Sequence, residues 1–420
     1  MTGEPELIRL PNGVRIALDP MPLETASLGI WIRVGARWER AEENGVAHLF
    51  EHMAFKGAGG RDARHFAEAV ESVGAIVNAA TSYERTAYYA RTLKRDVGFL
   101  FELLADVVRA PHWQEEDLEK EKGVVAQERG EAFDQPDDRV FELHQSAVFR
   151  DQPLGRPVLG EAESLAGVRI ATLEAFRAAH YAPARIVIAV AGGYDRAEIL
   201  ARAEARFGDL ATGPAEAPLS AAPRGGVAAE ARKLEQAHTV LSWPAPAAGS
   251  GDIFAARLLA EIYGGGMASR LFQDVRESRG LVYAIDSYLE TYEDAGRLGV
   301  YAGCGAVNAG LVAERATAIL GELAEHGPTA KEMQRAKAVV GAQMLMGAEA
   351  PSARAEARAS QVFLRDRLLS FSEIAAQAEA VTAEAVQAAA RTAAEGVLAV
   401  GAVGPRAGVK AVEAFMARFV

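Results

Sequence analysis

The sequence predicts an α+β fold with two domains, and three observations support this prediction. The chain has 420 residues, more than one ordinary hydrophobic core accommodates, so two domains of about 200 residues are expected. A stretch rich in proline and glycine divides the chain into halves of similar length. Strand and helix patterns alternate without a strict strand–helix–strand rhythm, which favours helices layered on mixed sheets.

The dividing stretch covers residues 213–231 and cannot sustain a long helix or a central strand. Its breaking residues are Gly213, Pro214, Pro218, Pro223, Gly225 and Gly226. We therefore expect an N-terminal domain over residues 1–212, a linker over residues 213–231 and a C-terminal domain over residues 232–420.

A weak internal repeat relates the two halves. Segments beginning at Arg64 and Arg270 share Arg, Phe, Glu, Ser and Gly at a constant offset, and each soon reaches a Ser-Tyr pair. In both segments a helical pattern leads through a glycine turn into a strand pattern. The two domains are therefore expected to be homologous.

The secondary structure elements follow from apolar periodicity. Strand patterns cover residues 13–18, 27–34, 75–80, 86–93, 186–191, 239–243 and 296–302. Helical patterns cover residues 46–55, 63–73, 95–109, 115–131, 173–180 and 330–346.

Composition argues against several partners and compartments. The formal net charge is −12, whereas nucleic acids and anionic membranes require a basic surface, so neither is an expected partner. Cys304 is the only cysteine, so no disulfide framework and no thiolate metal site is expected. The first residues lack a targeting pattern, and no stretch reaches the ~20 apolar residues of a membrane span. We expect a cytoplasmic protein.

A metal-binding pattern, His48-Leu-Phe-Glu51-His52, lies in an apolar helical stretch after Asn44, a favourable N-cap residue. Histidines four positions apart lie on one helix face, so both imidazoles can bind one ion. Glu51 lies beside that face, where it can accept a proton from an attacking water. This is the zinc-peptidase pattern His-Glu-x-x-His in reverse order. The alternative is a helix with two unrelated histidines and a solvated glutamate.

A catalytic zinc needs a third protein ligand and one open position. Glu121 and Glu128 share a face of the next long helical pattern with the apolar residues Leu118, Val124 and Val125. Burying two carboxylates is costly unless a cation compensates them, and zinc is such a cation. We predict one zinc ion per chain, Glu128 as the third ligand, and Glu121 as a group that orients Glu128 or a histidine. The other histidines lack partners at ligand spacing and are expected to be structural.

Several stretches resemble the pitrilysin-type inverzincin zinc peptidases. They read Leu10-Pro-Asn-Gly-Val, Gly45-Val-Ala-His-Leu-Phe-Glu-His-Met-Ala-Phe-Lys-Gly, Asn78-Ala-Ala-Thr-Ser and Pro153-Leu-Gly-Arg-Pro-Val-Leu-Gly. The likeness covers nearly the whole chain and is strongest to the catalytic subunit of the mitochondrial processing peptidase and its bacterial homologues. It implies two homologous α/β-sandwich domains with mixed, mostly antiparallel sheets, which form half of a clam-shell.

The resemblance also implies roles for individual residues. His48, His52 and Glu128 would bind zinc, and Glu51 would be the general base. Asn78 and Ala79 would belong to an edge strand that pairs with the substrate backbone.

Three further features carry roles only through this resemblance. Asp138 and Glu142 fall where the processing peptidase carries acids that bind a substrate arginine near the cleaved bond; solvated helix charges are the alternative. Arg276 and Tyr283 resemble a pair that completes the active site from the opposite lobe. The alternatives are a surface charge for Arg276 and a strand-core aromatic for Tyr283. Glycines 264–266 resemble the glycine-rich loop of the non-catalytic processing-peptidase subunit.

These observations predict a zinc endopeptidase that hydrolyses extended or unfolded polypeptides inside a closed chamber, with a preference for a basic residue near the scissile bond. Zinc motif and glycine-rich loop occur together in this chain, so we expect a homodimer whose Tyr283 serves the partner's site. One alternative is a catalytic subunit that needs a different partner chain. The other is a structural subunit of the core type found in respiratory complexes.

Overall fold

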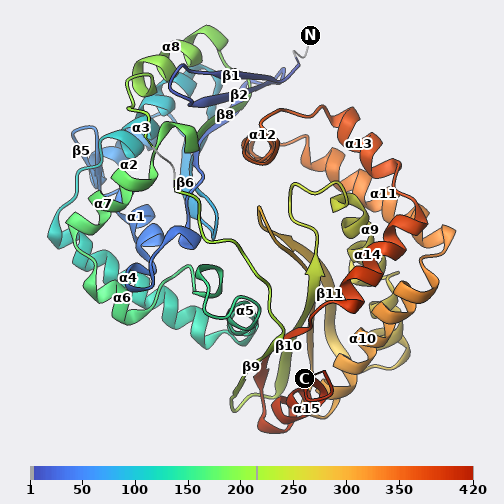
Figure 1. The fold of residues 1–420 in the computed structure, drawn as a ribbon. Coiled ribbons are helices and arrows are strands. Elements are labelled where there is room, and N and C mark those ends of the chain that lie inside the picture. The colour runs from blue at the N-terminus through green and yellow to red at the C-terminus, as the bar shows by residue number, and fades with distance from the viewer. Residues whose placement is uncertain (1–3, 214–215, 420) are drawn as a thin grey trace. The chain divides into compact units, whose positions relative to one another are not determined.

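The computed structural model describes residues 4–213 and 216–419, which divide into two compact units, each a sheet packed against helices (Figure 1). The first unit contains the described residues of Met1–Arg129, Arg156–Leu219 and Leu345–Ser370. The second contains those of Gly130–Gly155, Ser220–Met344 and Phe371–Val420. The predicted α+β class with two α/β-sandwich domains is confirmed.

The sheet of the first unit has six strands in the order β1-β2-β8-β3-β7-β6. They are β1 (Glu6–Arg9), β2 (Arg15–Pro20), β3 (Thr25–Ile32), β6 (Ile76–Thr81), β7 (Thr86–Leu93) and β8 (Ile186–Gly192). Strands β2 and β8 are parallel, and the other neighbours are antiparallel. Strand β6 is therefore an edge strand, which pairs only with β7 among the described strands.

The sheet of the second unit has five strands in the order β11-β12-β10-β13-β9, which is the topology of the first sheet without a counterpart of β1. Its strands are β9 (Gly226–Ala231), β10 (Gln236–Ala245), β11 (Val282–Thr291), β12 (Gly296–Gly305) and β13 (Ala399–Gly404). Again one pair, β9 and β13, is parallel, and the remaining pairs are antiparallel. Strand β9 uses the last residues of the predicted linker, because a run of small and apolar residues follows Gly225 and Gly226.

Helices from both halves of the chain pack around the two sheets. In the first half they are α1 (Val46–Ala54), α2 (Ala63–Ser72), α3 (Val97–Arg109), α4 (Glu115–Asp134), α5 (Pro136–Val148), α6 (Ala162–Gly167), α7 (Ile170–His180) and α8 (Arg196–Phe207). In the second half they are α9 (Ile253–Gly264), α10 (Ala309–His326), α11 (Ala330–Gly347), α12 (Pro351–Arg365), α13 (Phe371–Glu379), α14 (Ala383–Glu395) and α15 (Arg406–Met416). Short elements are the 3₁₀ turns η1 (Ala36–Trp38), η2 (Ala41–Glu43), η3 (Lys94–Asp96), η4 (Pro153–Gly155), η5 (Pro183–Arg185) and η7 (Ala306–Asn308), the π-helical η6 (Phe272–Ser278), and the strands β4 (Gly57–Ala58) and β5 (Arg61–Asp62).

Two helices are exchanged between the halves. Helix α5 packs on β9, β10 and β13 of the second unit, and α12 packs on β2, β3 and β8 of the first. Each sheet has a second face that must be covered, because its strands are apolar on both sides. The compact units are therefore not the two contiguous halves of the chain. The segment with α5 belongs to the second unit, and the segment with α12 belongs to the first.

Candidate metal centre

The start of α1 is fixed by a buried carboxylate rather than by Asn44. Glu39 accepts hydrogen bonds from the backbone nitrogens of Gly45 and Ala47, each at 2.8 Å, and from the side chain of Asn44. Gly45 is the N-cap and has a φ of 95°, a left-handed conformation that glycine adopts without strain. The expected N-cap, Asn44, instead links Glu39 to the carbonyl oxygen of Pro157. Burial raises the pKa of the Glu39 carboxyl to about 7, against the hydrogen bonds from Gly45, Ala47 and Asn44. The bonds from Gly45 and Ala47 satisfy backbone donors at the start of the helix that carries the histidines.

Three potential metal ligands meet beside α1. One nitrogen each from His48 and His52 and one oxygen from Glu128 of α4 lie within 4.8 Å of one another. Oε2 of Glu128 is 3.8 Å from Nε2 of His48 and 3.5 Å from Nε2 of His52. Among the residues that the structure describes, this is the one such group of three histidine, cysteine or acidic side chains.

Glu121 orients His52. Its Oε2 lies 3.0 Å from Nδ1 of His52, and its Oε1 lies 2.6 Å from Nζ of Lys56. Because a carboxylate paired with a lysine accepts rather than donates, Nδ1 of His52 carries the proton. The lone pair on Nε2 of His52 is then directed to the point that His48 and Glu128 also face.

The donor set fits a zinc ion. Burial and then the neighbouring His52 lower the pKa of His48 to about 4, so its ring is neutral and can offer a lone pair. Two imidazole lone pairs and a carboxylate oxygen converging on one point repel each other unless a cation lies between them. Two histidines with one glutamate form a known catalytic zinc set. The residues present therefore suit the metal that the sequence predicted.

Glu128 is less buried than its position in the helix pattern suggested. Its side chain is 39% exposed, and Val124 is exposed as well, whereas Leu118, Glu121 and Val125 are buried. The buried stripe of α4 is thus narrower than predicted. Exposure of Glu128 leaves the cluster accessible from solvent, as a site with an open coordination position requires.

Glu51 lies on α1 between the two histidines and is half-buried. Burial raises the pKa of its carboxyl group, Thr81 and His52 oppose that rise, and Glu128 adds to it. Within the described residues, its buried Oε2 has no hydrogen-bond partner. A carboxylate with one free oxygen and a raised pKa beside a metal cluster can accept and return a proton.

Asn78 and Ala79 lie on β6, the edge strand of the first sheet, and α1 contacts this strand. Asn78 is exposed and Ala79 is buried. The unpaired edge of β6 offers backbone donors and acceptors, which an extended peptide could pair with.

Asp138 and Glu142 lie on α5, which belongs to the second unit. Asp138 is exposed, and no ion pair of its side chain is found among the described residues. Glu142 already pairs with Arg139 at 2.9 Å, and Arg139 also binds Glu230 at 3.0 Å. The two acids therefore share a helix but differ in their freedom to bind a substrate.

Arg276 and Tyr283 also belong to the second unit. Arg276 lies on the π-helical segment η6, exposed and stacked 4.7 Å from the ring centroid of Phe272. Tyr283 is 71% exposed on the edge strand β11. It lies at a register shift between Val282 and Ala284, and such bulges redirect side chains. Tyr283 is thus not a strand-core aromatic.

Three residues of this centre were not identified from the sequence. Glu39 is separated from α1 by the short turn η2, and no local pattern marked it as a cap. Thr81 lies on strand β6 and lowers the pKa of Glu51, which lies on helix α1. Lys56 follows His52 by four positions, a spacing that could have pointed to a shared face.

One unit carries the cluster of His48, His52 and Glu128, and no second such cluster is found among the described residues. This arrangement is that of a two-domain metallopeptidase, and comparisons with known proteins agree. Residues 15–162 match the insulinase domain of peptidase family M16, and residues 168–340 match the inactive domain of that family. The chain belongs to peptidase family M16, the insulinase family, whose pitrilysin-type zinc proteases the sequence resembled.

Curated relatives are similar over most of their length. An uncharacterized zinc protease of Streptomyces coelicolor is 35% identical over 394 residues, covering 91% of this chain and 85% of that protein. The uncharacterized zinc protease YmxG of Bacillus subtilis is 35% identical over 382 residues, covering 90% of this chain and 93% of that protein. A particular closeness to the mitochondrial processing peptidase does not follow from these relatives.

Solved structures share the fold. A peptidase M16 inactive domain from Pseudomonas fluorescens superposes with a TM-score of 0.87 at 22% identity, covering 96% of this chain and 98% of that one. A protease from Helicobacter pylori gives a TM-score of 0.86 at 19% identity, covering 96% of this chain and 100% of that one. In the described part of the chain, no helix is long and apolar enough to cross a membrane.

Proposed function

We propose that this chain is a zinc-dependent endopeptidase with one zinc ion held by His48, His52 and Glu128. The observation that carries the proposal is the convergence of three ligand atoms within 4.8 Å. Beside them lies Oε2 of Glu51, which has no hydrogen-bond partner among the described residues. The names of the curated relatives, which are zinc proteases, support the same activity.

The residues divide the chemistry between them. A zinc ion bound there supplies Lewis-acid chemistry, polarising the scissile carbonyl and acidifying a water molecule. Glu51 accepts the proton of the attacking water and returns it to the amine nitrogen of the leaving peptide. Glu121 keeps Nε2 of His52 directed at the metal through the hydrogen bond to Nδ1.

The substrate is an extended or unfolded polypeptide that adds a strand to β6, within a closed chamber. Support comes from the unpaired edge of β6 at Asn78 and Ala79, because backbone pairing needs an extended chain and little side-chain information. Asp138, with Glu142, reads a basic residue near the scissile bond, as in a processing peptidase. The exposure of Asp138 supports this role more than the paired state of Glu142 does.

The active site is completed by a second copy of the chain in a cytoplasmic homodimer. Tyr283 of one molecule donates a hydrogen bond to the developing oxyanion at the partner's zinc, and Arg276 assists from the same lobe. High exposure of Tyr283 on an edge strand supports a contact outside its own core. A catalytic subunit with a different partner chain is the alternative assembly. A structural role is less well supported, because all three zinc ligands are present.

The test is the variant Glu51→Gln. It should bind about one zinc per chain, as the wild type does, because no ligand is removed. It should lose peptide hydrolysis by several orders of magnitude, because the proton acceptor is gone. Zinc content is measured by atomic emission, and hydrolysis by cleavage of a peptide library. Full activity in the variant, or loss of its zinc, would contradict the assigned roles.

A further inference from the structure

The first unit contains a cavity that is separate from the metal centre. It has a volume of about 680 Å³ and lies at the C-terminal ends of α3 and α7, within the range of about 300–1,000 Å³ typical of small-molecule sites. None of its lining residues belongs to the metal cluster. Tyr181 lines it and also packs on Phe50 of α1 with ring centroids 4.9 Å apart.

The lining is basic, although the chain has a net charge of −12. Arg40, Arg109, Arg177 and His180 line the cavity, and Glu216 is the single acidic residue among its described lining residues. Arg109 is neutralised outside the cavity by a bidentate contact with Asp209, at 2.6 and 3.0 Å. Arg40 and Arg177 have no such partner among the described residues.

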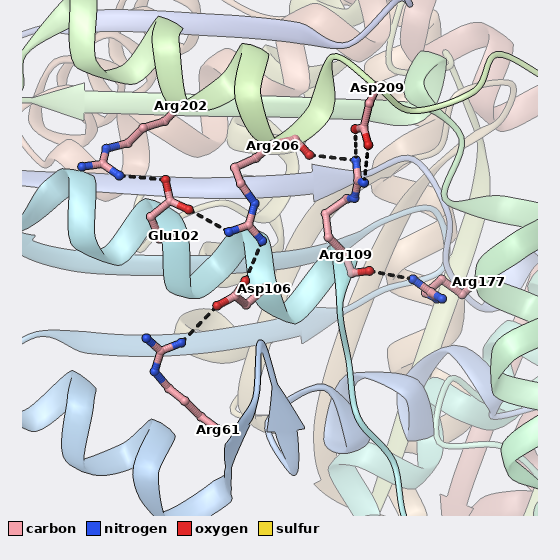
Figure 2. Close-up of polar contacts among 8 residues, drawn as sticks. All are labelled: Arg61, Glu102, Asp106, Arg109, Arg177, Arg202, Arg206 and Asp209. Atoms are coloured by element: carbon pink, nitrogen blue, oxygen red, sulfur yellow. Dashed lines mark hydrogen bonds and ion pairs between the residues drawn. The ribbon is translucent and has the colours of Figure 1, made fainter.

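Figure 2 makes the difference between Arg177 and its neighbours visible. Arg61, Arg109, Arg202 and Arg206 each donate to a carboxylate. Among the residues that the structure describes, Arg177 donates only to the backbone carbonyl of Arg109, at 3.1 Å. Its Nε is buried and has no hydrogen-bond partner in the described part of the chain. A partly buried guanidinium without a counter-ion is costly, and a bound anion would offset that cost.

His180 adds a directed donor. Arg185, which is 4% exposed, donates to Nδ1 of His180 at 3.0 Å. Because arginine only donates, Nδ1 holds the lone pair and Nε2 carries the proton. Burial, and then the charges of Arg185 and Arg40, lower the pKa of His180 to about 4. The ring is therefore a neutral Nε2–H donor near pH 7, and the charge of Arg40 lies close to it.

We propose that this cavity binds a phosphate-bearing small molecule, with its phosphate held by Arg40, Arg177 and Nε2–H of His180. Phosphate accepts hydrogen bonds through several oxygens and matches the planar fork of arginine. The groups named are donors, so the ligand must supply the acceptors. The volume exceeds that of a single phosphate group, so the ligand carries a further phosphate or an organic part.

Isothermal titration calorimetry of the zinc-loaded full chain tests the proposal, with pyrophosphate, inorganic phosphate and citrate as probes at low ionic strength. Pyrophosphate should saturate one such site per chain and bind more tightly than citrate. Arg40→Gln and Arg177→Gln should each weaken it about tenfold, the loss expected for one charge-assisted hydrogen bond. Arg95→Gln is the matched control: Arg95 is 78% exposed in the same unit, and its loss should leave affinity unchanged.

The remaining outcomes contradict the proposal. Wild-type affinity in both Arg40→Gln and Arg177→Gln would place pyrophosphate at the zinc instead. Absence of saturable binding by pyrophosphate and phosphate would remove the site. If citrate binds more tightly than pyrophosphate and its affinity also depends on Arg40 and Arg177, the cavity binds a carboxylate ligand and not a phosphate. Melting temperature and zinc content check that the variants are folded, and Arg40, being exposed, decides the outcome if Arg177→Gln does not fold.

Discussion

Nζ of Lys56 lies 2.6 Å from Oε1 of Glu121, while the other oxygen of that carboxylate lies 3.0 Å from Nδ1 of His52. A lysine thus acts on the metal centre through two intervening hydrogen bonds. It holds Glu121 in the orientation that directs Nε2 of His52 to the metal.

Lys56→Met should weaken zinc binding about tenfold, the lower end of the effect seen for groups that support metal ligands. Methionine keeps the length of the side chain but cannot donate to Glu121. Zinc affinity is measured by competition with a chelator, and Lys56→Arg should restore most of it. Lys120→Met is the control on α4, since Lys120 pairs with Glu116 on the exposed side. Equal zinc affinity in Lys56→Met and Lys120→Met would show that the lysine does not support the metal.

The exchanged helix α12 is tied to the first sheet by a buried ion pair. Nε of Arg358 lies 2.8 Å from Oδ2 of Asp19, and both side chains are 2% exposed. Arg358→Met should destabilise the protein by about 3 kcal/mol, because the buried charge of Asp19 loses one of its two arginine partners. Arg354 is the partner that remains. Urea denaturation measures the change. Arg9→Met, which removes an exposed pair with Asp366, should cost less than about 1 kcal/mol. Similar losses in the two variants would be inconsistent with this account.

Glu332 links the helix start of α11 to the segment that follows the glycine-rich loop. It forms a bidentate contact with Arg270 at 2.7 and 3.0 Å and accepts from the backbone nitrogen of Thr329 at 2.7 Å. The hydrogen bond from Arg270, with those from Thr329, lowers its pKa from 4.5 to about 2.

Because the folded state lowers this pKa, the carboxylate contributes stability that is fully present above pH 4.5 and is lost as the pH falls towards 2. Glu332→Gln should lower the melting temperature at pH 7, by the equivalent of about 1 kcal/mol for a partly solvated pair. The difference from the wild type should shrink as the pH falls towards 2. Glu325→Gln, on an exposed site, serves as the control. A difference that stays constant with pH would exclude this linkage.

Subunit mixing tests whether Tyr283 acts on a partner. Glu51→Gln and Tyr283→Phe should each be inactive alone. A mixed dimer has one doubly altered site and one intact site if Tyr283 serves the partner. Random exchange makes about half of the dimers mixed, so about a quarter of wild-type activity should return. Native mass spectrometry verifies the exchange. Mixed dimers without activity would place Tyr283 in its own chain or outside catalysis, and would leave the zinc assignment intact.

The sequence alone predicted the elements that have strong local signals. Helix α1 carries its histidines on one face because four positions make about one turn, and the structure has α1 at Val46–Ala54. Glycines and prolines marked the boundary between the sheets, because these residues interrupt regular backbone. The sequence also predicted that Glu128 joins His48 and His52, and the three side chains meet in the structure. The premise of that prediction, a carboxylate buried on an apolar helix face, holds for Glu121 and not for Glu128, whose side chain is 39% exposed.

Only the tertiary structure decided which distant segments meet. No local pattern indicates that α5 covers the second sheet and α12 the first. Any helix with a suitable apolar stripe can cover the apolar face of a sheet, so the sequence pattern does not select the partner. Likewise, the sequence does not show that Lys56 reaches Glu121, that Glu39 caps α1, or that Arg177 lacks a carboxylate partner among the described residues. Such contacts depend on atomic distances between elements, which the folded chain fixes and residue spacing does not.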